Sequence, residues 1–198
     1  MQGLGHSVEE EGLGEKMAAC EKSASEELGD AYTFFQMTQR LVKILDLPLG
    51  TEAAALLADA YAGPRYASWL FPGTHRVVKA LHGAGIYLGI IANTAWTGFS
   101  MDRAFDGVGL LPYFSTLIYS GDIGMSKPDP RIFAQALRVS GRTAERILYV
   151  GNDLTADVKG ASGVGWSTAF RTTKPEGSGG LADFDYQETE ELLTYIDV

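Results

Sequence analysis

The chain has 198 residues, of which 45% are hydrophobic and 21% are charged, and its formal net charge is −9 at pH 7. These values are ordinary for a globular protein that can bury one core and carry an insertion. The acidic balance, without a cluster of Lys and Arg, argues against binding to nucleic acid or to an anionic membrane surface. Cys20 is the single cysteine, which excludes an internal disulfide, and the sequence has neither a run of about 18 apolar residues nor a signal-peptide pattern. We therefore expect a cytoplasmic protein.

The pattern of the first 70 residues predicts an irregular N-terminal arm followed by helices. Residues 1–18 are rich in Gly and Glu, which favours an irregular arm. From residue 19 to residue 45 apolar residues recur at helical spacing, and Pro48 ends this pattern. An Ala- and Leu-rich helix follows, so we expect residues 19–70 to form a separate helical unit.

The rest of the chain alternates between expected strands and helices. Strands are expected at residues 86–92, 116–119, 147–150 and 167–170, and helices near residues 99–105, 132–137 and 156–161. Such alternation is typical of parallel strands joined by right-handed crossovers. We therefore predict an α/β fold with a Rossmann-like, doubly wound parallel sheet over residues 71–172. A flexible connector and a short helix at residues 188–196 are expected within the C-terminal segment 173–198.

The segment that follows the expected strand 147–150 carries the most chemical information. Gly151 ends the strand, and Asn152, Asp153 and Asp157 follow where a loop turns into a helix. Two carboxylates four residues apart at the carboxyl end of a parallel strand suit a hard cation, usually Mg²⁺. The same residues also suit a turn in which Asp or Asn caps the following helix.

Two further segments supply polar groups. The prolines of Lys127-Pro-Asp-Pro forbid a helix through Lys127, which places this lysine on a stiff loop just before a helix. Asn93 and Thr94 follow the strand 86–92, where hydroxyl, amide and backbone N–H groups can bind an anion. A lysine is usually a solvated charge and small polar residues often form a plain turn, so each segment alone carries little weight.

The order of these segments along the chain is the specific signal. A strand that ends in small polar residues, a Lys-Pro-Asp-Pro loop, and a strand that ends in Gly-Asn-Asp with a later Asp together resemble the haloacid dehalogenase-like (HAD) hydrolase superfamily over residues 71–171. The resemblance implies a HAD-like core in which residues 19–70 form a helical cap that closes over the site and selects the substrate. Response regulators also combine carboxylates, a Thr and a Lys on a doubly wound sheet, but in an order that this chain does not have.

The resemblance also implies roles for individual residues. It gives one catalytic lysine, three phosphate- or substrate-binding residues and two metal ligands: Lys127; Asn93, Thr94 and Asn152; Asp153 and Asp157. Of the two ligands, we expect Asp153 to contact Mg²⁺ directly and Asp157 to lie behind it or to bind through water. The implied activity is Mg²⁺-dependent hydrolysis of phosphate esters or related small organic substrates. The implied partner is a small phosphorylated or anionic molecule, and the sequence leaves a homodimer open.

Two features depart from the family pattern. Family members open with a strand ending in Asp-x-Asp, whose first Asp is the covalent nucleophile, whereas residues 1–30 contain no run of four apolar strand-forming residues. The first aspartates, Asp30, Asp46 and Asp59, lie in segments with helical patterns, and Ala92 stands where relatives carry a Ser or Thr hydroxyl. The chain is therefore expected to be inactive and to bind Mg²⁺ weakly. It would be a truncated hydrolase or a non-catalytic relative that binds a ligand or a protein, unless another carboxylate attacks.

The missing strand also has a structural consequence. In HAD domains the nucleophile strand lies between the strands that match residues 86–92 and 147–150. An empty space there would leave buried main-chain groups unpaired, each at a cost of about 1–3 kcal/mol. We expect the two flanking strands to pair directly. Filling by the N-terminal arm is disfavoured because the arm is polar and Gly-rich, and filling by another subunit is the remaining alternative.

Overall fold

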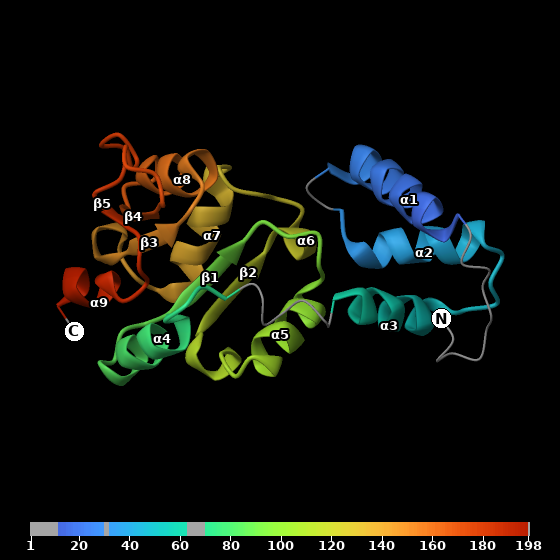
Figure 1. The fold of residues 1–198 in the computed structure, drawn as a ribbon, viewed down its shortest axis with the longest axis horizontal. Helices are drawn as coiled ribbons and strands as arrows, with labels where there is room; N and C mark the ends of the chain where they lie inside the picture. The colour runs from blue at the N-terminus through green and yellow to red at the C-terminus, as the bar shows by residue number, and fades with distance from the viewer. Residues whose placement is uncertain (1–11, 30–31, 63–69, 198) are drawn as a thin grey trace.

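The computed structural model describes residues 12–29, 32–62 and 70–197, which form a helical unit and an α/β unit (Figure 1). The helical unit contains α1 (Leu13–Leu28), α2 (Phe34–Ile44) and α3 (Thr51–Ala62). The helical pattern of residues 19–45 is thus divided between two helices, and α1 begins inside the segment expected as an arm. Residues 1–11 of that arm and Asp30 lie outside the described residues.

Helix α2 begins at a capping box. The Thr33 side chain accepts a hydrogen bond from the Gln36 amide, and the Gln36 side chain accepts one from the Thr33 amide at 2.6 Å. One face of α2, with Met37 and Leu41, packs on Cys20 and neighbouring apolar residues of α1. The Thr38 hydroxyl donates to the Ala54 carbonyl at 2.8 Å and so ties α2 to α3.

The α/β unit alternates strands and helices, as the sequence predicts. Its helices are α4 (Thr74–Gly83), α5 (Gly98–Gly107), α6 (Ser120–Ile123), α7 (Pro130–Ser140), the π-helical segment η6 (Leu154–Lys159), α8 (Gly160–Ser162) and α9 (Glu191–Ile196). Its strands are β1 (Gly89–Ala92), β2 (Thr116–Tyr119), β3 (Leu148–Gly151), β4 (Ser167–Arg171) and β5 (Phe184–Tyr186). All strand pairs are parallel, which confirms the predicted fold class. Strand β5, in the C-terminal segment, was not expected.

The strands form two sheets instead of one. One sheet has the order β1-β2 and the other has the order β3-β4-β5, and no described strand lies between β1 and β3. The expected direct pairing of residues 86–92 with residues 147–150 is therefore wrong. None of the four residues of β1, or of the four of β3, falls among the buried residues.

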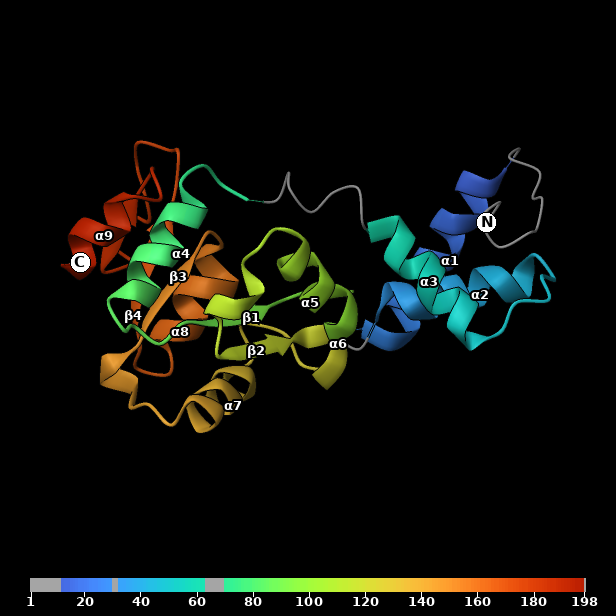
Figure 2. The same ribbon diagram turned by 90° about the horizontal axis from the view of Figure 1, so that it is seen from below.

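A common core joins the two half-sheets although they share no main-chain hydrogen bonds. Phe133 of α7 is fully buried and packs with Ile118 of β2 and with Trp166, and the partly buried Ile91 and Tyr149 complete the cluster from β1 and β3. On the other face, α4 and α9 cover β4 with their own apolar residues. Figure 2 shows α4 and α7 on opposite sides of the strands.

The helical unit is attached to the loop that follows β1. The Phe34 amide at the start of α2 donates to the Ala95 carbonyl at 2.6 Å. The Phe34 ring meets the Trp96 ring edge to face, with 5.0 Å between the ring centroids. Trp96 is buried, so this attachment forms part of a hydrophobic core that includes Met101 and Tyr119.

The contact between α8 and α7 leaves no room for a side chain at Gly160. A Cβ atom there would lie 2.8 Å from the Phe133 ring and 3.3 Å from the Pro128 Cα. Because Phe133 is fully buried, we expect Gly160→Ala to lower the free energy of unfolding by about 1–3 kcal/mol. The control Gly83→Ala, at a helical position with no atom within 4 Å, should be neutral or slightly stabilising. Urea denaturation measures both, and equal effects would contradict the expectation.

Candidate active site

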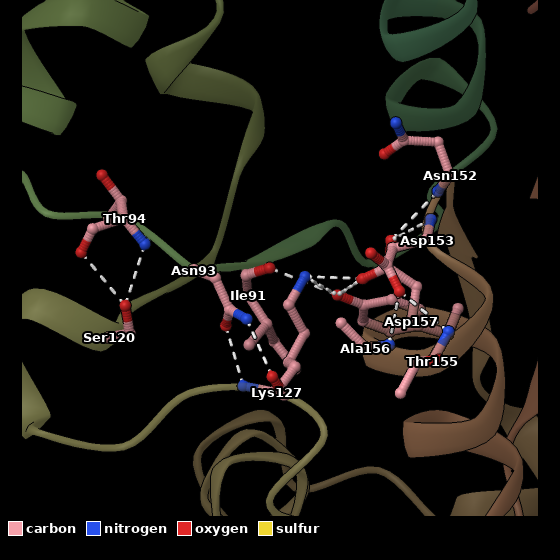
Figure 3. A network of polar contacts seen from close by, with 11 residues as sticks. Ile91, Asn93, Thr94, Ser120, Lys127, Asn152, Asp153, Thr155, Ala156 and Asp157 are labelled. Carbon is pink, nitrogen blue, oxygen red and sulfur yellow. Dashed lines mark hydrogen bonds and ion pairs between the residues drawn. The ribbon is translucent and has the colours of Figure 1, made fainter. Parts of the chain in front are cut away.

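Lys127 occupies an internal position where the predicted polar segments meet, at the carboxyl ends of β1 and β3 (Figure 3). Its Nζ lies 2.7 Å from Asp157 Oδ1 and 2.7 Å from the Tyr149 hydroxyl. The side chains of Lys127 and Asp157 are 10% and 7% exposed. Lys127 is therefore not a solvated surface charge, because it forms an ion pair with Asp157.

The Asp157 carboxylate is engaged on both oxygens. Oδ1 binds Lys127 and is also 3.4 Å from the Tyr149 hydroxyl. Oδ2 accepts hydrogen bonds of 3.0 Å from the amides of Asn152 and Asp153. A Cβ atom at Gly151 would lie 2.4 Å from this carboxyl group, so only glycine allows the approach. Asp157 thus closes the turn after β3 and neutralises Lys127.

Asp153 has a different environment from Asp157. Its side chain is exposed, and its Oδ1 accepts hydrogen bonds from the amides of Ala156 and Thr155 at 2.7 and 2.8 Å. This is the helix cap that the sequence offered as the alternative to a metal ligand. These two amides, with a smaller contribution from the charge of Lys127, hold the pKa of Asp153 below its ordinary value. Oδ2 accepts no hydrogen bond from the described residues and remains open to a ligand.

Asn93 fixes the backbone at Lys127. Its side-chain amide donates to the Lys127 carbonyl and accepts from the Lys127 amide, both at 2.8 Å. The Lys127–Pro128 peptide bond is cis. Asn93 was expected to bind substrate, and in this arrangement its side chain instead holds the loop that carries the lysine against the end of β1.

Thr94 and Asn152, the other expected substrate-binding residues, do not direct their side chains at Lys127. The Thr94 hydroxyl accepts from the Trp96 amide at 3.1 Å and points away from Lys127, so it does not replace the hydroxyl that Ala92 lacks (Figure 3). The Thr94 main chain is held by the Ser120 hydroxyl through bonds of 2.8 and 3.1 Å. Asn152 contributes its amide to Asp157, while its side chain points outward (Figure 3).

Tyr149 is a member of the site that sequence reasoning missed. Its hydroxyl accepts from Lys127 at 2.7 Å and lies 3.2 Å from the Ile91 carbonyl, so it connects β3 to β1. Its ring packs edge to face on Phe133. Burial, reinforced by the charge of Asp157, raises the pKa of Tyr149 well above its ordinary value, and the phenol stays protonated. The sequence feature that could have indicated this role is a tyrosine in an otherwise aliphatic strand, two residues before Gly151.

The donor atoms of this site fit Mg²⁺ only in part. No group of three or more His, Cys, Asp or Glu residues that could hold a metal ion occurs within residues 12–29, 32–62 and 70–197. Asp157 is occupied by Lys127 and two amides, which leaves Asp153 Oδ2 as the open carboxylate oxygen. Mg²⁺ usually keeps several waters and is often held by one or two carboxylates. The residues present therefore fit a weakly held, largely hydrated ion.

A hollow of about 310 Å³ elsewhere on the α/β unit is separate from Lys127. It is lined mainly by residues 172–177 and 185–191, with the carboxylates of Glu176, Asp185 and Glu191 among them. These acidic groups disfavour an anionic ligand. The candidate site for an anion is therefore the Lys127 region.

Residues 16–165 match the sequence pattern of the haloacid dehalogenase-like hydrolase family. The chain belongs to this family. The resemblance predicted from the order of the motifs is thereby confirmed.

Relatives of this HAD-like chain include several phosphatases. A phosphoserine phosphatase from Thermus thermophilus is 31% identical over 142 residues, which cover 69% of this chain and 56% of the relative. A pyrimidine 5'-nucleotidase from Escherichia coli is 33% identical over 113 residues, covering 54% of this chain and 48% of the relative. The chain spans about half the length of the curated relatives it matches.

Solved structures confirm the HAD-like fold. A 2-haloacid dehalogenase from Pseudomonas syringae superposes with a TM-score of 0.67 at 22% identity, covering 96% of this chain and 82% of that one. A HAD phosphatase from Thermococcus onnurineus superposes with a TM-score of 0.63 at 21% identity, covering 93% and 88%. At this identity the similarity establishes the fold and not the substrate.

Two substitutions distinguish the helix-capping role of Asp153 from the effect of its negative charge. We expect Asp153→Ala to lower the free energy of unfolding by about 1 kcal/mol, because the amides of Thr155 and Ala156 lose their acceptor. Asp153→Asn should change it by much less, because Asn also accepts at a helix N-terminus. The lowered pKa makes the charged cap stabilising above the pKa of an unfolded aspartate, about 4, and this contribution is lost as pH falls through the folded value. Denaturation at pH 7 measures the free energy of unfolding of both variants. An equal decrease in the two would argue against a capping role for Asp153.

Proposed function

We propose that this HAD-like chain is a phosphatase-type hydrolase domain for small phosphorylated molecules, and that the 198-residue chain alone is inactive or nearly so. The observation that carries the proposal is the buried Lys127, paired with Asp157 at the carboxyl ends of two parallel strands. Relatives named phosphoserine phosphatase and glyceraldehyde 3-phosphate phosphatase support the substrate class.

Lys127 is the residue suited to bind the anionic group. Its backbone is clamped by Asn93, and its ammonium group can share its charge between Asp157 and an arriving phosphate oxygen. In a chain with a net charge of −9, such a local positive group is needed to hold an anion. Lys127 would also stabilise negative charge that develops on the transferred group.

The proposed inactivity rests on the lack of a suitable attacking carboxylate among the described residues. Asp157 is buried and its oxygens are held by Lys127 and two amides, which makes it a poor nucleophile. Asp153 is engaged in capping the helix that follows β3. Asp46 and Asp59 belong to the helical unit, and their sequence pattern gives no reason to assign them this role.

A magnesium ion is the proposed cofactor, because HAD phosphatases are generally Mg²⁺-dependent. Asp153 would hold it through the open Oδ2, with Asp157 close behind and already neutralised by Lys127. When bound, the ion would neutralise charge on the phosphate group. At this site Asp153 is the one open carboxylate among the described residues, which supports the expectation of weak binding.

The helical unit is proposed as a cap over the site. It is attached through Phe34 to Ala95 and Trp96, on the loop that also carries Asn93 and Thr94. A position next to the substrate-binding loop suits a unit that selects substrates.

A cytoplasmic location remains a proposal, and it rests on the free, buried Cys20. Among the described helices, none combines the length and the apolar composition that crossing a membrane requires.

A non-catalytic module that binds a ligand or a protein is the alternative. The ion pair of Lys127 with Asp157 favours it, because both groups are satisfied without a substrate. A protein-binding face at residues 34, 35 and 37 of α2 gains less support. Met37 is buried and Phe34 packs on Trp96, so these side chains do not form an exposed apolar patch for a partner.

Catalysis can be tested directly with p-nitrophenyl phosphate and Mg²⁺. We expect turnover by the 198-residue chain far below about 1 per second, because none of the carboxylates that the structure describes is placed to attack. The Lys127→Ala variant should show the same background rate. A rate near 1 per second or above that Asp153→Asn abolishes would show that another carboxylate attacks.

Metal binding can be tested independently of activity. We expect weak Mg²⁺ binding that Asp153→Asn weakens by at least about tenfold, because the substitution removes the open anionic oxygen. Asp129→Asn is the matched control, since Asp129 also caps a helix but pairs with Arg131. Calorimetry, or relaxation of water protons by Mn²⁺, measures the affinities. Tight binding that survives Asp153→Asn would place the metal elsewhere.

A further inference from the structure

Arg171 is an arginine without an acidic partner at the carboxyl end of the sheet β3-β4-β5. It is the last residue of β4, and its Nε is buried and has no hydrogen-bond acceptor among the described residues. Its guanidinium group forms no ion pair within the part of the chain that the structure describes. A buried donor without an acceptor is rare in native proteins and requires an explanation.

The Phe71 ring holds the guanidinium group of Arg171 in place. Phe71 lies in the segment before α4, and its ring centroid is 3.8 Å from Arg171 Cζ. Stacking on a ring uses the flat face of a guanidinium group and leaves the N–H donors at its edge for other contacts. Phe71 is 44% exposed, so the stacked pair lies at the surface of the α/β unit.

Tyr186 supplies a second donor beside Arg171. The two residues are register partners on the parallel strands β4 and β5, so their side chains lie on the same face of the sheet. Tyr186 is 5% exposed, and its hydroxyl forms no hydrogen bond with any described residue. Burial raises the pKa of Tyr186 to about 12, although the charge of Arg171 opposes this shift. The phenol is therefore protonated at neutral pH and can donate a hydrogen bond.

The carboxylates around this pair are engaged elsewhere. Both oxygens of Asp157 are already held. Asp185 alternates with Tyr186 along β5, and it accepts hydrogen bonds from the Ser178 amide and hydroxyl at 2.8 and 3.0 Å. Glu191 Oε1 accepts from two main-chain amides at 2.7 and 3.0 Å. Arg171 itself does not line the acidic hollow to which Asp185 and Glu191 belong.

We propose that Arg171 and Tyr186 form a subsite for the carboxylate group of a small organic acid. The edge of a guanidinium group offers two parallel N–H donors that match the two oxygens of a carboxylate. The Tyr186 hydroxyl adds a further donor. The exposed part of the Phe71 ring provides apolar surface next to these donors, which suits an acid with an aromatic or apolar body.

The subsite lies beside the candidate active site and is distinct from it. Gly151 of β3 pairs with Phe170 of β4, so the following residues, Asn152 and Arg171, stand next to each other. The main-chain amide of Asn152 holds Asp157. A bound acid therefore lies one strand away from the ion pair of Lys127, but it does not use that lysine. The inference is independent of the proposed phosphatase activity.

Titration of the 198-residue chain with sodium benzoate, without Mg²⁺, tests the subsite. We expect saturable binding that shifts the NMR signals of the Arg171 side-chain Nε–H and of the main-chain amide of Tyr186, while Ile118 in β2 is unchanged. Acetate should bind about threefold more weakly, because it lacks a ring to contact Phe71. Inorganic phosphate that displaces benzoate from Arg171 and binds there more tightly would overturn the assignment to a carboxylate.

Variants of the two donors locate the binding on the protein. Arg171→Gln should weaken benzoate binding by at least about tenfold, and Tyr186→Phe by about threefold while keeping the ring in the core. Arg142→Gln is the matched control and should leave binding unchanged. Arg142 also lies over an aromatic ring, that of Tyr87, at 4.9 Å and forms no ion pair with a described residue, but it precedes the amino end of β3.

Glu190 provides the decisive alternative. Its carboxyl group lies against Gly73, two residues after Phe71, and could pair with Arg171 in solution. Benzoate binding that appears only in Glu190→Gln would identify an internal ion pair and overturn the proposal. Equal loss of binding in Arg142→Gln, or undiminished binding in Arg171→Gln, would also overturn it. Because binding is measured without turnover, a failure of the phosphatase proposal would not change these results.

Discussion

The buried carboxylate of Asp157 is the group on which the functional end of the α/β unit depends. A charge in this position costs several kcal/mol unless it is paired and hydrogen-bonded. Lys127, the Tyr149 hydroxyl and the amides of Asn152 and Asp153 meet that requirement together. These contacts hold four parts of the chain together: β3, the turn that follows it, the helical segment η6, and the loop before α7.

This arrangement explains why stability and chemistry compete in the site. The hydrogen bonds that make Asp157 tolerable in the interior also occupy the lysine that would bind an anion. Asp153, four residues earlier, remains accessible because its helix cap uses only one of its oxygens. The two carboxylates of this motif therefore have different roles. Asp157 stabilises the fold, whereas Asp153 leaves one oxygen accessible to a ligand.

The parts of the fold that sequence predicted are those with strong local causes. Apolar runs defined four strands, and the prolines after Lys127 fixed its loop, so their order along the chain was enough to identify the family. Strand β5 has only three residues and lies close to a Gly-rich turn, which hid its pattern. Direct pairing of β1 with β3 was wrong because it assumed that both edges are buried, and burial depends on the whole fold.

The roles of side chains within the site were the least predictable. Asn93 has the composition of a ligand-binding residue, yet its amide matches the Lys127 backbone at 2.8 Å on both sides. Tyr149 lies within the expected strand 147–150, which gives no reason to place its hydroxyl in the ion-pair network where the structure has it. Such pairings depend on distances between segments that are far apart in sequence, which a local pattern does not contain.

The attachment of α2 to the loop after β1 limits how modular the chain can be. Phe34 is held by Ala95 and Trp96, and Asn93, two residues before Ala95, holds the backbone of Lys127. Exchange of the helical unit for one from another relative would uncover Trp96 and loosen the segment that orients the lysine. For protein engineering, the interchangeable block therefore includes residues 93–97 together with α1–α3, and a graft cut at the domain boundary alone would also disturb the site.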